Sequence, residues 1–300
     1  MSEGRDWRIF TGSGDPHDAV ERLAERSPPW RSFANADGLL PRTLGVELRG
    51  QDFVADPEMV ELVNAALWLR RPLLIRGNPG TGKSTLARAV AFELKLGPTL
   101  IWPINTRSTL TEGLYRYDAI GRLQESSLRP GDSSPPLGRY LQLGPLGTAL
   151  LPAARPRVLL IDEIDKSDID LPNDLLHVFE EGRFEIPELA RLPEGDAYDV
   201  QQVRVFDGDE HETVPLRRGK VICHAFPFVV LTSNGERDFP PAFLRRCICL
   251  DLRVPTAERL AEIVKARLGP EAVIAGQALI EHFVQLRTQY NDALATDQLL

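Results

Sequence analysis

Five short apolar runs stand out along the middle of the chain, at residues 73–75, 98–104, 157–162, 226–232 and 247–252. None of them alternates strictly between apolar and polar residues, as a strand with one solvated face would. Continuous runs of this length are typical of strands that are buried on both faces of a parallel sheet. Helical patterns separate the runs, so the sequence predicts an α/β fold.

Helix signals lie on both sides of this core. Asp56 is a candidate N-cap and Pro57 suits the first helical position, so a helix is expected to begin there. After Pro255, two amphipathic segments follow each other without an intervening strand, which predicts a small helical region. We therefore divide the chain into an amino-terminal extended arm at 1–56, an α/β core at 57–254 and a helical region at 255–300.

Two long stretches interrupt the core. The first, residues 109–150, has a middle rich in Pro, Ser and Gly between short helical pieces. The second, residues 185–225, contains "VRVF" and "TVPL" on either side of "DGDEHE", a pattern typical of a β-hairpin. We expect both stretches to be additions to the core sheet.

Composition narrows the class of protein. Of the 300 residues, 43% are hydrophobic and 26% charged, as in an ordinary globular protein with an ample core. The formal net charge of -8 repels nucleic acid at long range and favours a protein or a small molecule as partner. The charged first residues do not resemble a secretory signal, and no run approaches the ~18 residues of a membrane span, so a cytoplasmic location is expected.

The three cysteines are Cys223, Cys247 and Cys249. Cys247 and Cys249 are two residues apart, which places them on one face of a strand. No Cys/His cluster supplies further ligands for a metal, so buried thiols are the favoured interpretation.

The amino-terminal arm at 1–56 is rich in Pro, Gly, Arg and Trp and has no sustained periodicity. Within it, Trp30 and Phe33 are aromatic residues in a loop. We expect them to pin the arm onto the core, the alternative being a patch that binds a partner.

The segment "GNPGTGKST" lies between a predicted strand and a predicted helix. Its spacing is that of a phosphate-binding loop, in which glycines let backbone N–H groups point at phosphate oxygens. The lysine supplies a charge to the β- and γ-phosphates, and the serine hydroxyl can ligate Mg²⁺. The candidate nucleotide-binding residues are Gly77, Asn78, Pro79, Gly80, Thr81, Gly82, Lys83, Ser84 and Thr85.

Two acidic residues end the apolar run at 157–162. Asp162 is expected at the carboxyl end of its strand, where it can hold Mg²⁺ together with Ser84. Glu163 beside it can act as general base on the attacking water. The "IDKSD" element that follows lies directly after the aspartate rather than after a later strand, so we favour ATP over GTP.

Three more residues follow the fourth run. Asn234 is expected at the end of that strand, where its amide could orient the attacking water. Arg245 and Arg246 close a short helix before the last strand, too far along the sheet to serve the same chain's nucleotide easily. The γ-phosphate of a neighbouring subunit is the better target for them.

Four segments in order, "GNPGTGKST", "VLLIDEID", "LTSN" and "AFLRRC", resemble the nucleotide loop, the magnesium and base strand, the first sensor and the arginine finger of AAA+ ATPases. The resemblance covers roughly residues 57–300. The stretch at about 110–145 resembles the helix-2 insert, and that at about 184–224 the pre-sensor hairpin, of the branch that contains MoxR-type ATPases and the McrB restriction motor.

The resemblance implies a five-stranded parallel sheet sandwiched by helices, a helical lid at 255–300, and a homo-oligomeric ring, usually a hexamer. It also implies ATP and Mg²⁺ as cofactors and ATP-driven remodelling of a partner protein. Arg246 is the first choice for the finger and Arg245 the second. MoxR relatives carry a second-sensor arginine where this chain has Thr296 and Asp297, so either that sensor is missing or the chain is a piece of a longer protein.

Two other functions share these motifs. A nucleic-acid motor is kept open by the basic residues Arg116, Arg122 and Arg129 of the first insertion. A regulatory nucleotide switch in a defence or signalling complex would hydrolyse ATP slowly and act by assembly. The sequence favours the ATPase that acts on a protein.

Overall fold

The computed structural model describes residues 6–25, 28, 45–47, 49–128, 135–193, 195, 199–207 and 212–289. The five apolar runs form one parallel sheet with the strand order β11-β1-β10-β5-β2. Its strands are β1 (Leu73–Arg76), β2 (Leu100–Pro103), β5 (Val158–Asp162), β10 (Phe228–Ser233) and β11 (Ile248–Asp251). The α/β fold with a five-stranded parallel sheet is confirmed.

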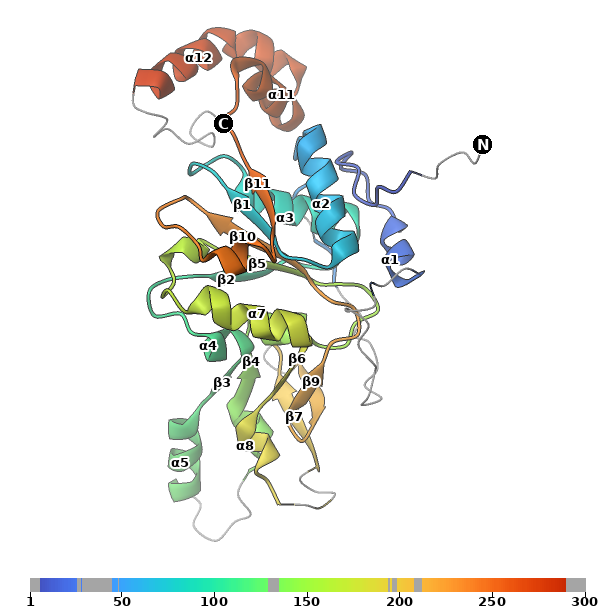
Figure 1. Ribbon diagram of the computed structural model, residues 1–300, viewed down its shortest axis with the longest axis vertical. Coiled ribbons are helices and arrows are strands. Elements are labelled where there is room, and N and C mark those ends of the chain that lie inside the picture. Colours follow the sequence, from blue (N-terminus) through green and yellow to red (C-terminus); the bar gives the residue numbers. More distant parts are fainter. Residues whose placement is uncertain are drawn as a thin grey trace.

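Helices cover both faces of the sheet (Figure 1). On one face lie α2 (Pro57–Leu69) and α3 (Lys83–Glu93), and on the other lie α6 (Pro145–Ala149) and α7 (Leu171–Glu181). Successive strand residues point to opposite faces, so the side chains of the apolar runs pack in two separate cores. Leu73 belongs to the core with α2 and α3, whereas Leu74 belongs to the core with α7.

Local sequence signals explain where helix α2 begins. The Asp56 carboxylate accepts a hydrogen bond from the Met59 backbone N–H at 2.8 Å, and Pro57 occupies the first turn. Both roles were predicted, because an N-cap side chain satisfies an N–H group that has no partner within the helix.

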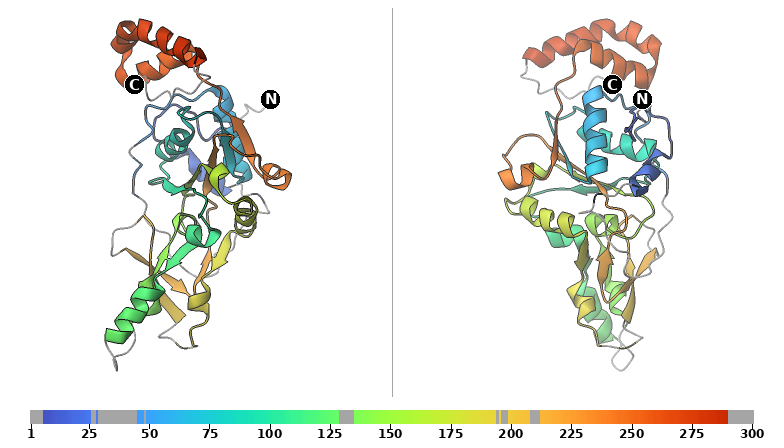
Figure 2. Two further views of the ribbon diagram at one scale, coloured as in Figure 1. Left: turned by 90° about the vertical axis from the view of Figure 1, so that its left-hand side faces the viewer. Right: turned by 45° about the vertical axis from the view of Figure 1, so that its right-hand side comes forward.

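The two insertions pack together as one unit at the end of the molecule opposite the helical lid (Figures 1 and 2). The predicted hairpin forms from β7 (Val200–Arg204) and β8 (Thr213–Arg217). The first insertion adds two strands that its pattern did not predict, β3 (Tyr115–Tyr117) and β4 (Leu141–Leu143), and β4 joins β7 to make a sheet in the order β3-β4-β7-β8.

Smaller elements complete the insertions. The first contains α4 (Leu110–Leu114), α5 (Ala119–Leu128) and the 3-10 helix η3 (Leu137–Tyr140). In the second, α8 (Pro187–Ala190) lies between β6 (Arg183–Glu185) and β9 (Lys220–Ile222), and these two strands pair antiparallel.

Two helices follow the sheet, α11 (Ala257–Leu268) and α12 (Pro270–Gln289), and their presence agrees with the expected helical lid. They share a small core of their own, made by Leu260, Val264, Ile280 and Phe283. The candidate second-sensor positions, Thr296 and Asp297, lie outside the described residues.

The described part of the arm packs on α2 and α3. It contains the 3-10 helix η1 (Ala19–Glu21) and a short helix α1 (Arg22–Glu25), which the sequence did not predict. Ile9 and Phe10 are fully buried in the core with α2 and α3. Trp30 and Phe33, the predicted pins, lie outside the described residues.

The three cysteines are free, and two of them, Cys223 and Cys247, are buried. The expectation that Cys247 and Cys249 share one face of a strand needs correction, because β11 begins at Ile248 and only Cys249 lies within it. Burial raises the pKa of the Cys247 thiol to about 12. Among the described residues, no cluster of three or more His, Cys, Asp or Glu is arranged to hold a metal, and no helix is long and apolar enough to cross a membrane.

Candidate nucleotide-binding site

The predicted phosphate loop connects the end of β1 to the start of α3. Gly77 has a φ of 155°, and a Cβ there would lie 2.6 Å from the Leu252 carbonyl oxygen. Gly82 is the N-cap of α3 with a left-handed φ of 89°. Glycine is therefore required at both places. The loop leads directly into the amino-terminal end of α3, where anions are favoured.

Lys83 is the first residue of α3 and is only 7% exposed. Its ammonium donates hydrogen bonds to the Gly77 and Asn78 carbonyl oxygens at 2.6 and 2.9 Å and to Asn234 Oδ1 at 2.7 Å. Burial lowers the pKa of Lys83, and the carboxylates of Asp162 and two further acidic residues oppose that shift. The charge thus lies inside the site, facing acidic groups.

Next to it, three side-chain oxygen atoms meet at the carboxyl end of β5. Ser84 Oγ donates to Asp162 Oδ1 at 2.8 Å, and Thr232 Oγ1 donates to the same oxygen at 2.6 Å. A hydroxyl and a carboxylate are hard oxygen ligands of the kind that Mg²⁺ prefers, with phosphate oxygens and water to complete its octahedron. Ser84 and Asp162 therefore fit the ion that the sequence assigns to them.

Glu163 follows the end of β5 in an unusual backbone conformation. Its φ of 60° and ψ of 49° are left-handed, which costs an ordinary residue about 1 kcal/mol or more and is common where a side chain must be aimed. One carboxylate oxygen accepts from Asn234 Nδ2 at 3.2 Å, and the other accepts from the Lys166 ammonium at 2.8 Å. The bond to Glu163 is the main reason that the pKa of Lys166 is raised.

Asn234 lies just past the end of β10, as predicted. Its amide oxygen accepts from Lys83 and its amide nitrogen donates to Glu163, so one side chain links the phosphate loop to the candidate general base. The structure therefore brings Lys83, Ser84, Asp162, Glu163 and Asn234 together from three segments, the start of α3 and the carboxyl ends of β5 and β10.

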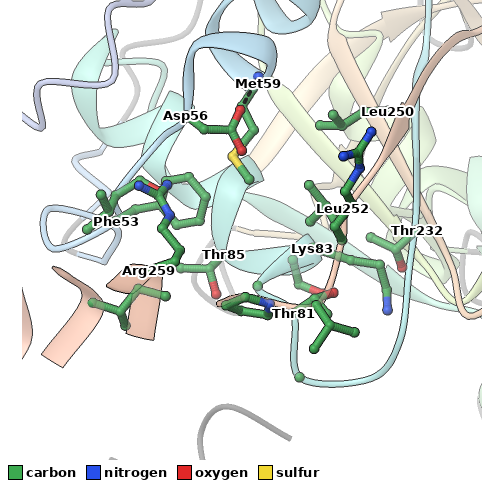
Figure 3. A pocket seen from close by; sticks show the side chains of 18 of the residues that line it. Phe53, Asp56, Met59, Thr81, Lys83, Thr85, Thr232, Leu250, Leu252 and Arg259 are labelled. Carbon is green, nitrogen blue, oxygen red and sulfur yellow. Dashed lines mark hydrogen bonds between the residues drawn. The ribbon is translucent and has the colours of Figure 1, made fainter. Parts of the chain in front are cut away.

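A cleft of about 680 Å³ opens beside this cluster. One side is made by Lys83 and Thr232, and the other by Phe53 from the arm and Arg259 from α11 (Figure 3). Its walls include Pro79, Gly80, Thr81, Gly82, Ser84, Thr85, Asp162, Glu163 and Asn234 from the predicted set. A cleft with polar groups at one end and apolar walls suits a nucleoside triphosphate.

Sequence reasoning missed three features of this site. Thr232 joins the magnesium and base residues, because its hydroxyl donates to Asp162 and accepts from the Glu163 backbone N–H at 2.8 Å. Phe53 and Arg259 reach the cleft from segments that were assigned to the arm and the lid, and Arg259 donates to the Val54 carbonyl oxygen. Of the three, only Thr232 could have been predicted from the sequence, because it lies in the "LTSN" segment.

The two candidate finger arginines lie away from the cleft. They follow α10 (Pro241–Leu244), and neither lines the cleft. Arg246 forms an ion pair with Glu180 on α7 at 2.5 Å, whereas the exposed Arg245 side chain has no hydrogen-bond or ion-pair partner among the described residues. Both are thus outside their own chain's nucleotide site.

Of the comparisons with known proteins, the family model is the one that identifies the family. No curated protein sequence matches the chain. A solved structure of a candidate ATPase from Cytophaga hutchinsonii aligns at 16% identity over 73% of this chain and 51% of that chain, with a TM-score of 0.36. The chain thus spans about half the length of that protein, and the likeness is too weak to assign a function.

The family model of the AAA domain, dynein-related subfamily, matches residues 72–247, which is more than half of the chain and contains the whole cluster. The chain therefore belongs to the AAA domain family, in its dynein-related subfamily.

Proposed function

We propose that this chain is a MoxR-like AAA+ ATPase that hydrolyses ATP at subunit interfaces of a homo-oligomeric ring and uses the energy to remodel or activate a partner protein. Its ring would be a hexamer. In this proposal the core at 57–254 binds the nucleotide and the helices at 255–300 form a lid. The insertions at about 110–145 and 184–224 act as helix-2 insert and pre-sensor hairpin and contact the partner.

The observation that carries the proposal is the position of the Asn234 amide between Lys83 and Glu163. Phosphate charge would compete with the loop carbonyls and Asn234 for the Lys83 ammonium. Asn234 would then be free to orient a water molecule against Glu163, which accepts its proton. Mg²⁺, held by Ser84 and Asp162, neutralises phosphate charge when it is bound.

The ring proposal rests on the arginines. Negative charge develops on the γ-phosphate during transfer, and Lys83 and Mg²⁺ supply only part of the compensating charge. Because neither Arg245 nor Arg246 lines its own cleft, we propose that one of them acts on the neighbouring subunit's nucleotide. Arg246 would have to leave Glu180 first, so the contacts favour Arg245, although the resemblance favours Arg246.

A protein partner is favoured over nucleic acid. Arg116 is exposed on β3, but Arg122 donates to the Tyr117 hydroxyl at 3.2 Å, and Arg129 lies outside the described residues. The net charge of -8 opposes long-range attraction to phosphate backbones.

Mixing inactive chains tests the shared site. Glu163→Gln lacks the base and Arg245→Ala or Arg246→Ala lacks a finger, so each should be inactive alone. A mixture can form interfaces with an intact Glu163 and an intact arginine, and part of the wild-type ATPase rate should return. If both arginine variants keep full, concentration-independent activity, the shared-site proposal is wrong.

ATP turnover measured with single-stranded DNA, with RNA and without either separates an ATPase that acts on a protein from a nucleic-acid motor. Turnover unchanged by nucleic acid agrees with a protein partner. Strong stimulation by either nucleic acid would contradict the proposal and favour a motor.

A further inference from the structure

Asp165 is a buried acidic residue that none of the assigned roles uses. It lies in η4 (Ile164–Lys166), three residues after Asp162, and is only 4% exposed. A carboxylate in such a place is costly unless polar groups compensate it.

One oxygen of Asp165 holds the backbone that follows β10. Oδ2 accepts hydrogen bonds from the Asn234 and Glu236 backbone N–H groups, at 2.9 and 3.1 Å. Oδ1 is buried and accepts no hydrogen bond from the described residues. A single carboxylate oxygen thus ties down both ends of the short segment 234–236.

This segment has few local contacts of its own, one of them the hydrogen bond that the Gly235 N–H donates to Ser233 Oγ at 3.0 Å. The β10 ladder ends at Ser233, so Asn234 is no longer held by the sheet. Gly235, with a φ of 79°, has no side chain with which to pack. The Asn234 side chain nevertheless has to span two atoms, Lys83 Nζ at 2.7 Å and Glu163 Oε1 at 3.2 Å.

We infer that Asp165 is a positioning residue, which holds the backbone at residues 234–236 so that the Asn234 amide stays aimed between the phosphate loop and the general base. The inference rests on the proposed ATPase function and adds a residue to its machinery. Asp165 acts through Asn234 and does not touch the nucleotide. Its loss should therefore slow turnover and leave ATP binding nearly intact.

The kinetic test compares three variants with wild type. Asp165→Ala removes both anchors and should lower kcat about 10- to 100-fold, because small displacements of orienting groups have effects of that size, with the KM for ATP little changed. Asp165→Asn keeps an acceptor oxygen and should stay within about threefold of wild type, since neutral acceptors are only moderately weaker. Asp168→Ala removes an exposed carboxylate from the same loop and should have no effect.

A double-mutant cycle separates positioning from plain stability. If Asp165 acts through Asn234, then Asp165→Ala should cost almost nothing further in kcat once Asn234→Ala is present. Full additivity of the two losses, or equal losses in Asp165→Ala and Asp165→Asn, would overturn the inference. A large rise in KM with kcat unchanged would also overturn it.

Amide hydrogen exchange at Asn234 and Glu236 gives a readout that does not depend on turnover. Asp165→Ala should speed exchange at both amides about tenfold or more, whereas Asp165→Asn should protect them. If Asp165→Ala does not fold, Asp165→Asn decides: protected amides with kcat within about threefold of wild type agree with the inference, and amides that exchange tenfold faster while kcat is unchanged overturn it. If the wild-type chain hydrolyses no ATP, the proposed function fails, and unchanged exchange in Asp165→Ala would separately refute the anchor.

Discussion

The two ends of helix α3 carry polar groups that are satisfied in different ways. At its amino-terminal end, Lys83 donates to two loop carbonyls and to Asn234, beside an open cleft. At its carboxyl-terminal end, Glu93 is 1% exposed and enclosed by the arm. The Glu93 carboxylate accepts hydrogen bonds from Thr11 N at 2.6 Å, Thr11 Oγ1 at 2.9 Å, Gly12 N at 3.3 Å and Gly14 N at 3.3 Å, and His17 Nε2 lies 3.2 Å away.

This difference separates function from stability along one helix. In the proposed function, Lys83 exchanges its partners for phosphate oxygens, because it lines the open cleft. Glu93 is enclosed, and its partly buried donors would be left unpaired if it were lost. Changes at the amino-terminal end should therefore alter activity without unfolding the chain, and changes at the other end should do the reverse.

The largest effects are expected at the cleft. Glu163→Gln should lower kcat by about 10²- to 10⁴-fold, the usual range for a general base, while ATP still binds. Lys83→Ala should instead weaken ATP binding about 10- to 100-fold, since it removes a charged hydrogen-bond donor. Calorimetry with ATP and a turnover assay distinguish the two, and unchanged melting temperatures would show that this end is not structural. Equal ATP affinity in wild type and Lys83→Ala would contradict the assignment.

At the other end, Glu93→Ala should lower the free energy of unfolding by about 3 kcal/mol or more, because several partly buried donors lose one charged acceptor. Glu93→Gln keeps one acceptor oxygen but turns an N–H group towards Gly14, so a smaller loss is expected. Urea unfolding measures both. A Glu93→Ala chain as stable as wild type would show that the arm is not held through this carboxylate.

The cleft could largely be predicted from the sequence, and the arm could not. Lys83, Asp162, Glu163 and Asn234 lie at ends of buried strands or at a glycine loop, and parallel strands bring such ends to one edge of a sheet. Glu93 looks like any polar residue of an amphipathic helix, because its donors come from residues 11–17, far away in sequence. Short-range periodicity carries no information on such pairs.

The insertions show the same limit. The hairpin of β7 and β8 was predicted, because its two strands are close in sequence. Strands β3 and β4 were not, because each has three residues and their sheet forms only when β4 meets β7 from the other insertion. Asp165, in the "IDKSD" element, was given no role of its own for a related reason, since the amides that it holds lie about seventy residues later.

Asn64 on α2 provides a second test of the arm. Its Oδ1 accepts from the Ile9 and Phe10 backbone N–H groups at 2.5 and 3.0 Å, and its Nδ2 donates to the Phe10 carbonyl oxygen at 2.7 Å. Asn64→Ala should lower the free energy of unfolding by about 2 kcal/mol, less than Glu93→Ala, because hydrogen bonds to a neutral amide are weaker than those to a carboxylate. Glu61→Ala, which removes only an exposed pair with Arg8, is the matched control and should change little. Similar losses in the two variants would contradict a specific role for Asn64.

The smallest effect is expected where the arm meets the helix end at the surface, through Asp18. Its carboxylate bonds to Lys95 and to Arg155, both at 2.8 Å, and these bonds hold the pKa of Asp18 below its ordinary value of 3.8. A carboxylate whose pKa is lowered by folding stabilises the folded chain above its unfolded pKa, and that contribution disappears as the pH falls through the lowered value. Asp18→Asn should therefore melt slightly below wild type at pH 7, and the gap should close as the pH falls below 3.8. Added salt should narrow the gap at pH 7, since the pair is exposed and screened. A gap that is independent of both pH and salt would mean that Asp18 contributes through packing and not through its charge.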